Sequence, residues 1–238
     1  MNDYQKAKEY DMLAQYYKYA NADLHIKYYK KHLHHLQTAL EVQRNNHELP
    51  GRVRILHAAP DYALVDVYIN GIKIFKELNY QDVSNYMNLP AGKYQIDIYP
   101  TGQMNPALFS RKIDVLAGQP FTLAPAGHQE SRRLIILREN HEVPSGEVKI
   151  NFVHLAPHLP EVDVAVKDGD IVFSSVSYKQ YTNYLGLSPM SVELELREIG
   201  SNESLAILPP LEFKPNGNYS IVLLRAKNSE MECRFLII

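Results

Sequence analysis

The sequence predicts a mainly β protein with two tandem antiparallel β-sandwiches, preceded by an α-helical hairpin. Three observations predict this fold class. The stretch VRILHAAPDYALVDVYI at residues 53–69 is repeated, with changes, as VKINFVHLAPHLPEVDVAV at residues 148–166. Short segments of alternating apolar and polar residues, separated by Gly and Pro, fill the chain after residue 50, which is typical of a sandwich. Residues 1–49 contain neither Gly nor Pro, although the chain has 11 glycines and 14 prolines.

The N-terminal block, residues 1–49, is predicted to form two helices. Apolar residues recur there at three- and four-residue spacing, in two runs separated by the good N-cap residues Asn21 and Asp23. The first run is Tyr10, Leu13, Tyr17 and Ala20, and the second is Leu24, Tyr28, Leu33, Leu36 and Leu40. Two helices bury little apolar surface by themselves, so we expect one face of this hairpin to dock on something else.

The first sandwich is predicted over residues 52–139. Val65, Val67 and Ile69 alternate with polar positions and lead into Asn70-Gly71, a dipeptide that favours a type I′ hairpin turn. Further strands are predicted at Val83–Leu89, Lys93–Tyr99, Leu108–Val115, Pro120–Ala124 and Arg133–Arg138.

The second sandwich is predicted over residues 147–238, after a linker at residues 141–146. His57, Pro60 and Asp66 recur as His154, Pro157 and Asp163, a constant shift of 97 residues (154 − 57). The hairpin turn recurs as Asp168-Gly169, now shifted by 98, so the second hairpin is one residue longer. A repeated unit of this size indicates two copies of one domain.

The motif V-R-x-x-H-x-x-P-x-x-x-x-V-D-V-Y-x-x-G, followed by Y-x-x-V-S-x-Y-x-x-L-P-A-G-x-Y, resembles an uncharacterised bacterial family of unknown function. It is carried by Val53, Arg54, His57, Pro60, Val65, Asp66, Val67, Tyr68, Gly71, Tyr80, Val83, Ser84, Tyr86, Leu89, Pro90, Ala91, Gly92 and Tyr94. The resemblance implies immunoglobulin-like or transthyretin-like sandwiches, often in tandem and often on exported proteins, without established catalytic residues. The tyrosine-rich helical block departs from the family pattern and is similar in composition to proteins of spore-forming bacteria.

His57 with Asp66, and His154 with Asp163, are the candidate pairs for general-base chemistry, because an Asp that orients a His begins such an arrangement. No serine or cysteine recurs beside both copies as a nucleophile. An active site need persist in only one copy, whereas a folding requirement is kept in both. We therefore predict that these residues have a structural role, with a His–Asp or backbone hydrogen bond pinning the first strands, and we assign no catalytic residue.

Histidines of the helical block form a second candidate site, since imidazoles at helical spacing can hold a metal ion. They are His25, His32, His34 and His35. No cysteine or carboxylate completes a known ligand spacing, so a solvated or docking face is favoured and no metal or other cofactor is expected.

The tyrosines of the helical block are candidates for an interaction surface, because Tyr is enriched in protein interfaces. Tyr10, Tyr17 and Tyr28 share the inner stripe and could instead cover the neighbouring β domain. Tyr16, Tyr19 and Tyr29 point away from that set and are the predicted contact residues.

Composition narrows the function class. The net charge of −2 gives no electrostatic attraction to nucleic acid or anionic membrane, and no apolar run reaches the length that spans a bilayer. The N-terminus lacks the apolar centre of a secretion signal, so a cytoplasmic or spore-associated location is expected. We expect a non-enzymatic interaction protein, a spore-coat or cell-envelope assembly component that self-associates or binds a protein partner. The alternative is a carbohydrate- or peptidoglycan-binding module, and a hydrolase would require a pocket with converging titratable groups.

Overall fold

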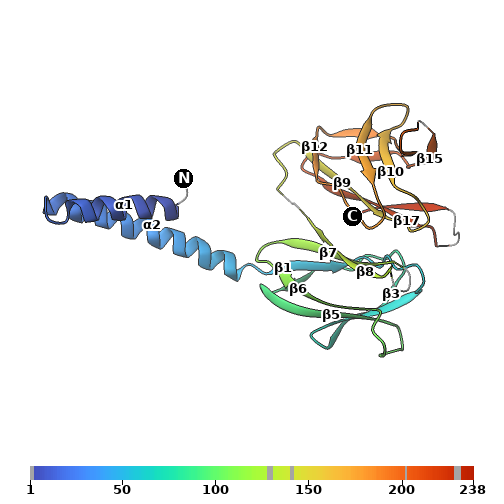
Figure 1. Ribbon diagram of the computed structural model, residues 1–238, viewed down its shortest axis with the longest axis horizontal. Coiled ribbons are helices and arrows are strands. Elements are labelled where there is room, and N and C mark those ends of the chain that lie inside the picture. Colours follow the sequence, from blue (N-terminus) through green and yellow to red (C-terminus); the bar gives the residue numbers. More distant parts are fainter. Residues whose placement is uncertain (1–2, 128–130, 140–141, 202, 228–231) are drawn as a thin grey trace. The chain divides into compact units, whose positions relative to one another are not determined.

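The computed structural model describes residues 3–127, 131–139, 142–201, 203–227 and 232–238, and it divides the chain into two compact units (Figure 1). Residues 1–50 with 116–118 form the helical unit, and residues 51–115 with 119–238 form the β unit. The mainly β fold with two N-terminal helices is confirmed.

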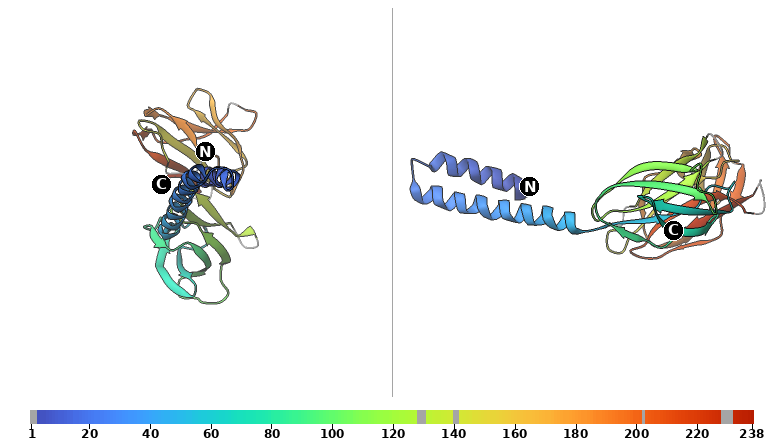
Figure 2. Two further views of the ribbon diagram at one scale, coloured as in Figure 1. Left: turned by 90° about the vertical axis from the view of Figure 1, so that its left-hand side faces the viewer. Right: turned by 90° about the horizontal axis from the view of Figure 1, so that it is seen from below.

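The helical unit is a hairpin of α1 (Asp3–Tyr17) and α2 (Ala22–Glu48), which lie side by side in the right-hand view of Figure 2. The predicted N-cap at Asn21 is confirmed, because its side chain accepts a hydrogen bond from the Leu24 amide at 3.0 Å. With 27 residues against 15, α2 is much longer than α1.

The first sandwich packs two four-stranded sheets, with orders β4-β1-β7-β8 and β3-β2-β5-β6. Its strands are β1 (Gly51–Ile55), β2 (Leu64–Ile69), β3 (Ile72–Asn79), β4 (Met87–Leu89), β5 (Gly92–Pro100), β6 (Phe109–Val115), β7 (Pro120–Ala126) and β8 (Arg133–Arg138). Alternate residues of both sheets, such as Ile55, Val67 and Ile98, meet in one buried core.

The second sandwich repeats this strand order, with sheets β12-β9-β17-β18 and β11-β10-β14-β15 and an additional β13–β16 pair. Its strands are β9 (Val148–Leu155), β10 (Val162–Val166), β11 (Ile171–Val176), β12 (Leu185–Leu187), β13 (Met190–Val192), β14 (Leu194–Glu198), β15 (Ser204–Ile207), β16 (Leu211–Phe213), β17 (Asn218–Arg225) and β18 (Cys233–Ile237). Of the predicted linker, residue 141 lies outside the described residues, and residues 142–146 form no helix or strand.

One pair of neighbours in each sandwich runs parallel within otherwise antiparallel sheets. These pairs are β1 with β7 and β9 with β17, in the same register relation. Alternation of apolar residues along a strand identifies its buried face but not the direction of its neighbour, so the sequence does not reveal this pairing.

The two predicted turns differ. Asn70 and Gly71 have φ of 50° and 78°, as a type I′ turn requires. In the second hairpin, Asp168 has φ of 56° but Gly169 is not among the residues with positive φ. The extra residue changes the turn geometry, and Gly169 instead packs closely on Val166, whose Cβ would lie 3.2 Å from a Cβ added to the glycine.

The sandwiches contact each other through the outer faces of the β1-β7-β8 and β9-β17-β18 strands. A buried cluster that includes Leu56, Ala124, Val153 and Val222 fills this interface. Every residue of β7 is buried, because one face of the strand points into its own sandwich and the other into the interface.

Hydrogen bonds complete the contact between the sandwiches at its edge. The Tyr80 hydroxyl and the side-chain amide of Gln81 both donate hydrogen bonds to the Arg225 carbonyl, at 2.9 and 2.7 Å. Arg234 donates to the Gln81 side-chain oxygen at 2.7 Å. The interface therefore has both an apolar centre and specific polar contacts.

Candidate functional site

The two repeated histidines are buried residues that organise the chain after β1 and β9. Nδ1 of His57 accepts a hydrogen bond from the Ala59 amide at 3.3 Å, and Nδ1 of His154 does the same with the Ala156 amide at 3.3 Å. Nε2 of His154 lies 3.0 Å from the Pro160 carbonyl, which assigns its proton to that nitrogen. These contacts are to the backbone. They correspond to the second of the two predicted alternatives, a backbone hydrogen bond in place of a His–Asp hydrogen bond.

Burial keeps both imidazoles uncharged near neutral pH. It lowers the pKa of His57 to about 4, against smaller raising effects from the backbone of Tyr62 and the charge of Asp82. Burial also lowers the pKa of His154. Such histidines are weak bases enclosed in protein, and their geometry supports a folding role.

The repeated aspartates hydrogen-bond to partners other than these histidines. Asp66 accepts from Lys73 Nζ at 2.6 Å, from the Glu77 amide at 2.9 Å and from Thr101 Oγ1 at 3.1 Å. Burial alone would raise the pKa of Asp66, but these hydrogen bonds outweigh burial and lower it. The predicted alternative of a direct His57–Asp66 hydrogen bond is therefore wrong, because the carboxylate is occupied within its own sheet.

Asp163 makes the equivalent bond, since its carboxylate accepts from the Ser175 amide at 2.7 Å. Ser175 and Glu77 occupy equivalent places in irregular strands β11 and β3, where they adopt positive φ of 54° and 53°. Each aspartate thus stabilises a β-bulge in the strand beside it. Here too the carboxylate serves the sheet, not the histidine.

A charged cluster beside β1 distinguishes the first sandwich, and residue patterns did not predict it. We define the arginine cluster as Arg54, Tyr86, Thr122 and Glu139. Arg54 donates to Thr122 Oγ1 at 2.8 Å and to Glu139 Oε1 at 3.2 Å. The Thr122 hydroxyl donates to Glu139 at 2.6 Å, and the Tyr86 hydroxyl donates to the other oxygen of that carboxylate.

The environment of the arginine cluster holds its tyrosine protonated. Burial, followed by the neighbouring Glu139 carboxylate, raises the pKa of Tyr86. The Arg54 guanidinium lies over the Tyr86 ring, 4.6 Å from its centroid. The cluster satisfies its own charges and contains no activated nucleophile.

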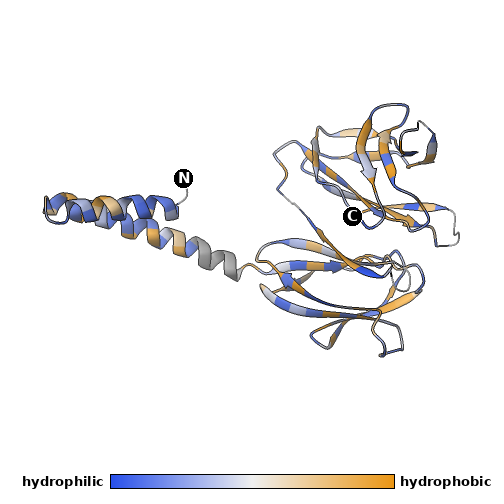
Figure 3. Cartoon of the chain, in the orientation of Figure 1, coloured by the Kyte–Doolittle hydropathy of each residue, from blue (hydrophilic) through white to orange (hydrophobic). Residues whose placement is uncertain are grey.

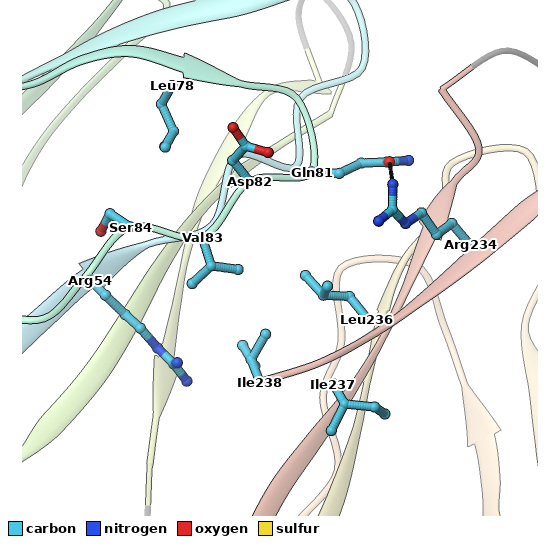
Figure 4. A pocket seen from close by; sticks show the side chains of 10 residues that line it. All are labelled: Arg54, Leu78, Gln81, Asp82, Val83, Ser84, Arg234, Leu236, Ile237 and Ile238. Carbon is cyan, nitrogen blue, oxygen red and sulfur yellow. Dashed lines mark hydrogen bonds between the residues drawn. The ribbon is translucent and has the colours of Figure 1, made fainter. Parts of the chain in front are cut away.

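A groove of about 580 Å³ adjoins the arginine cluster at the edge of the contact between the sandwiches (Figure 4). Val83 and Leu236 belong to the apolar lining of the groove. Figure 4 also shows the hydrogen bond that the Arg234 guanidinium donates to the Gln81 side-chain oxygen. Ser84 also lines the groove, but its hydroxyl accepts from the Ile55 amide at 2.9 Å and donates to the Asn85 carbonyl at 3.0 Å. Both of these hydrogen bonds are to the backbone, so Ser84 joins β1 to the segment that precedes β4.

Three histidines of α2 contact α1. Nδ1 of His25 lies 2.8 Å from the Ala14 carbonyl, and Nδ1 of His32 lies 3.0 Å from the Ala7 carbonyl. His35 lies 2.9 Å from the Asp3 carboxylate. The seven-residue spacing of the first two histidines matches that of the two alanines on the antiparallel helix, so these side chains join the helices of the hairpin.

The tyrosines of the hairpin divide into an inner and an outer set. Tyr28 stacks on Tyr10 and Tyr17, with centroid distances of 6.2 and 5.7 Å, so the inner set packs between the helices. Tyr16, Tyr19 and Tyr29, the predicted contact residues, are 75%, 92% and 46% exposed. Tyr4 is 55% exposed as well, while in the described part of the β unit the exposed tyrosine is Tyr181, at 44%.

Within the residues that the structure describes, neither helix is both long enough and apolar enough to cross a membrane.

Residues 51–165 match the model of a family described as a domain of unknown function, DUF4397. The match covers the first sandwich, β9 and most of β10. None of the curated proteins matches the chain.

Two solved structures have limited similarity to the chain. One is the Bacillus anthracis TIE protein, with 17% identity and a TM-score of 0.25, over 74% of this chain and 34% of that one. The other is a putative cell adhesion protein from Bacteroides fragilis, with 10% identity and a TM-score of 0.19, over 79% of this chain and 97% of that one. The chain therefore spans 34%, about a third, of the length of the Bacillus anthracis protein.

Proposed function

We propose that this chain is a non-enzymatic interaction protein in which the helical hairpin makes the contacts and the β unit is the scaffold. The observation that carries the proposal is the gathering of exposed tyrosines on the hairpin. Tyr4, Tyr16, Tyr19 and Tyr29 are all at least 46% exposed, although large aromatic side chains are usually buried in part by a folded chain. Exposed aromatic groups of this kind mark contact surfaces.

The same distribution weighs against the alternative, a carbohydrate- or peptidoglycan-binding module. Glycan recognition by a β-sandwich would be favoured by several exposed aromatic rings on one sheet face. In the described part of the β unit, Tyr181 is the one tyrosine in the exposed class, and Tyr68 is buried. A glycan would therefore have to bind without an aromatic platform on the sheets.

We assign the contact surface to assembly at a spore coat or cell envelope, with a proteinaceous layer as the partner. The composition of the hairpin motivates this assignment. We further propose that residues 147–238 are a second, diverged copy of the family domain, since its sheets have the same strand order as those of the first sandwich.

Binding of purified protein to isolated spore or envelope material tests the proposal. The triple variant Tyr16→Ser, Tyr19→Ser and Tyr29→Ser is expected to lose most of the binding, and a truncated chain of residues 51–238 is expected to lose all of it. Tyr181→Ser is the matched control, because Tyr181 and Tyr29 have similar exposure, 44% and 46%.

Circular dichroism and thermal melts of the same proteins separate loss of contact from loss of fold. The interaction proposal requires the truncated chain to stay folded. An unfolded truncated chain, or full-length protein with no affinity for either material, contradicts the proposal and favours a ligand-binding role for the groove.

A further inference from the structure

We propose that the hairpin pairs with the hairpin of a second copy of this chain, through an apolar seam along α2, to form an antiparallel four-helix bundle. The inference rests on the proposed role of the hairpin as the contact element and adds the partner and the geometry. The seam is defined by Ile26, Tyr29, Leu33, Leu36 and Leu40.

The spacing of the seam residues is the first argument. Successive members are three, four, three and four residues apart, which is the a/d pattern of a helix that packs on another helix over its length. At 1.5 Å per residue the seam extends over about 21 Å. Figure 3 shows apolar residues along α2 interleaved with hydrophilic ones, as a one-sided seam requires.

The partner α1 leaves most of this seam open. The side chains of α2 that contact α1 are others, including His25, Tyr28 and His32. Ile26, Leu33 and Leu40 are each at least 46% exposed. Leu36 is partly buried and lines a groove together with Ala7 and Met12 of α1, so α1 leaves most of the seam open, though not all of it.

The hairpin also lacks a core of its own among the described residues. Its fully enclosed apolar side chains there are Ala7 and Ala14, and all of the buried apolar clusters lie in the β unit. Short helices in water derive most of their stability from packing of an apolar face. Burial of the seam would provide this packing.

Two shallow grooves show where a second hairpin would contact the first. One, of about 310 Å³, lies between the helices and includes Tyr4, Met12 and Leu36. The other, of about 420 Å³, continues along α2 past Leu36 to Leu40. Leu36 lines both grooves, so the apolar surface is continuous from the paired part of the hairpin to the part of α2 that follows it.

Charge distribution selects the antiparallel arrangement. The flank beside the seam starts with Asp23, Lys27 and Lys30, two lysines against one aspartate and therefore net positive, and it ends with Glu41. Antiparallel pairing about Leu33 brings the lysines of one copy near Glu41 of the other. In a parallel pair the same flank of the two copies would lie on opposite sides of the seam, so the lysines and Glu41 would not meet.

Sedimentation equilibrium of the full chain tests the stoichiometry. The wild type is expected at twice the chain mass of 27.3 kDa. Leu33→Glu is expected to weaken dimerisation by at least about a hundredfold, because each substituted carboxylate would face its counterpart in an apolar seam. Leu13→Glu, which changes an exposed leucine of α1 outside the seam, should leave the mass unchanged.

Charge exchange keeps the test valid if Leu33→Glu also unfolds the helices. Glu41→Lys should weaken the dimer by about threefold to tenfold, and adding Lys27→Glu and Lys30→Glu should restore it. These surface changes leave the seam intact. Weakening without restoration would overturn the antiparallel arrangement.

Oxidative cross-linking tests the geometry independently, in a Cys233→Ser background that removes the single native cysteine. Leu33→Cys should form a disulfide-linked dimer, because Leu33 faces its counterpart, whereas Leu40→Cys, opposite Ile26 of the second copy, should not. Cross-linking at both positions would indicate parallel pairing and overturn the arrangement. A wild type of single-chain mass at every concentration would overturn the dimer itself, while loss of binding to envelope material with the dimer intact would count against the proposed function alone.

Discussion

The two sandwiches share a strand order, a buried histidine near the end of the first strand and an aspartate that stabilises a β-bulge. They bury different polar groups beside β1 and β9. Where the first sandwich has the arginine cluster, the second has neutral residues. Asn151, Ser220 and Tyr184 take the places of Arg54, Thr122 and Tyr86. The Tyr184 and Ser220 hydroxyls lie 3.3 Å apart, and Asn151 makes a long 3.5 Å contact with the Thr182 carbonyl.

This difference separates the requirements of folding from features that belong to one copy. His57 and His154, and likewise Asp66 and Asp163, have the same backbone contacts in both copies, so those contacts belong to the architecture. The arginine cluster occurs beside the groove of the first sandwich, and in the second sandwich neutral residues stand at the places of Arg54, Thr122 and Tyr86.

An edge strand of the first sandwich has a side chain hydrogen-bonded to its backbone. In the first, Arg111 of β6 donates to the Leu134 carbonyl of the edge strand β8 at 2.9 Å. A guanidinium on an outward carbonyl occupies a group that another strand could otherwise pair with. The first sandwich thus protects an edge that sheet pairing leaves open.

The largest expected difference between the copies comes from the arginine cluster. Arg54→Met would leave Glu139 without its buried cation and is expected to lower the free energy of unfolding by about 3–5 kcal/mol. Asn151→Leu at the equivalent position should cost about 1 kcal/mol or less, because its hydrogen bond is long. Urea denaturation measures both.

The double variant Arg54→Met with Glu139→Gln is the control for that comparison. Removing both charges should recover part of the lost stability, since it leaves no unpaired buried ion. Equal effects of Arg54→Met and Asn151→Leu would show that the cluster is not what distinguishes the two copies.

The buried histidines should behave alike in both copies and make the β unit sensitive to acid. The pKa of His57 falls from 6.5 to about 4 on folding, so the unfolded chain binds the proton more tightly. The resulting stability is present above pH 6.5 and is lost as pH falls toward 4, up to about 3 kcal/mol at 1.36 kcal/mol per pKa unit.

Urea denaturation at several pH values tests the acid sensitivity. His57→Gln should flatten the slope of stability between pH 6.5 and 4, and His154→Gln should change it in the same direction, because burial lowers the pKa of both imidazoles. An unchanged slope in both variants would mean that the histidines titrate in the folded state as they do in solution.

A smaller difference is expected between the aspartates. Asp66→Ala should cost about 2–3 kcal/mol and Asp163→Ala about 1–2 kcal/mol, because Asp66 accepts hydrogen bonds from Lys73 and Thr101 in addition to the bulge amide. Thermal melts of the two variants side by side measure the order. A larger loss of stability in Asp163→Ala than in Asp66→Ala would assign the stronger bulge contact to the second sandwich.

The smallest expected effects concern the hairpin turns. Gly71→Val should destabilise the first sandwich by about 1–2 kcal/mol, because a β-branched residue resists the φ of 78° found there. Gly71→Asn, which tolerates positive φ, is the control and should cost less. If the Gly71→Val variant has the same melting temperature as the Gly71→Asn variant, the type I′ assignment is contradicted.

The sequence by itself determined the elements. Alternation identified the strands, Asn21 identified the helix break, and Asn70-Gly71 identified the first turn, because each of these signals acts within a few residues. The repeated positions also indicated a structural role for His57 and Asp66. The outward side chains Tyr16 and Tyr19 followed from helical periodicity, although their role as contacts stays a prediction.

Only the tertiary structure decided which distant groups meet. Arg54, Tyr86, Thr122 and Glu139 come from four separate segments, and nothing in their local sequence pairs them. The parallel pairing of β1 with β7 brings Arg54 beside Thr122 and thereby assembles the cluster. Likewise, the tertiary structure places the carboxylate of Asp66 against a bulge in β3 and not against His57. Side-chain partners depend on the register of neighbouring strands, and alternation along one strand does not encode that register.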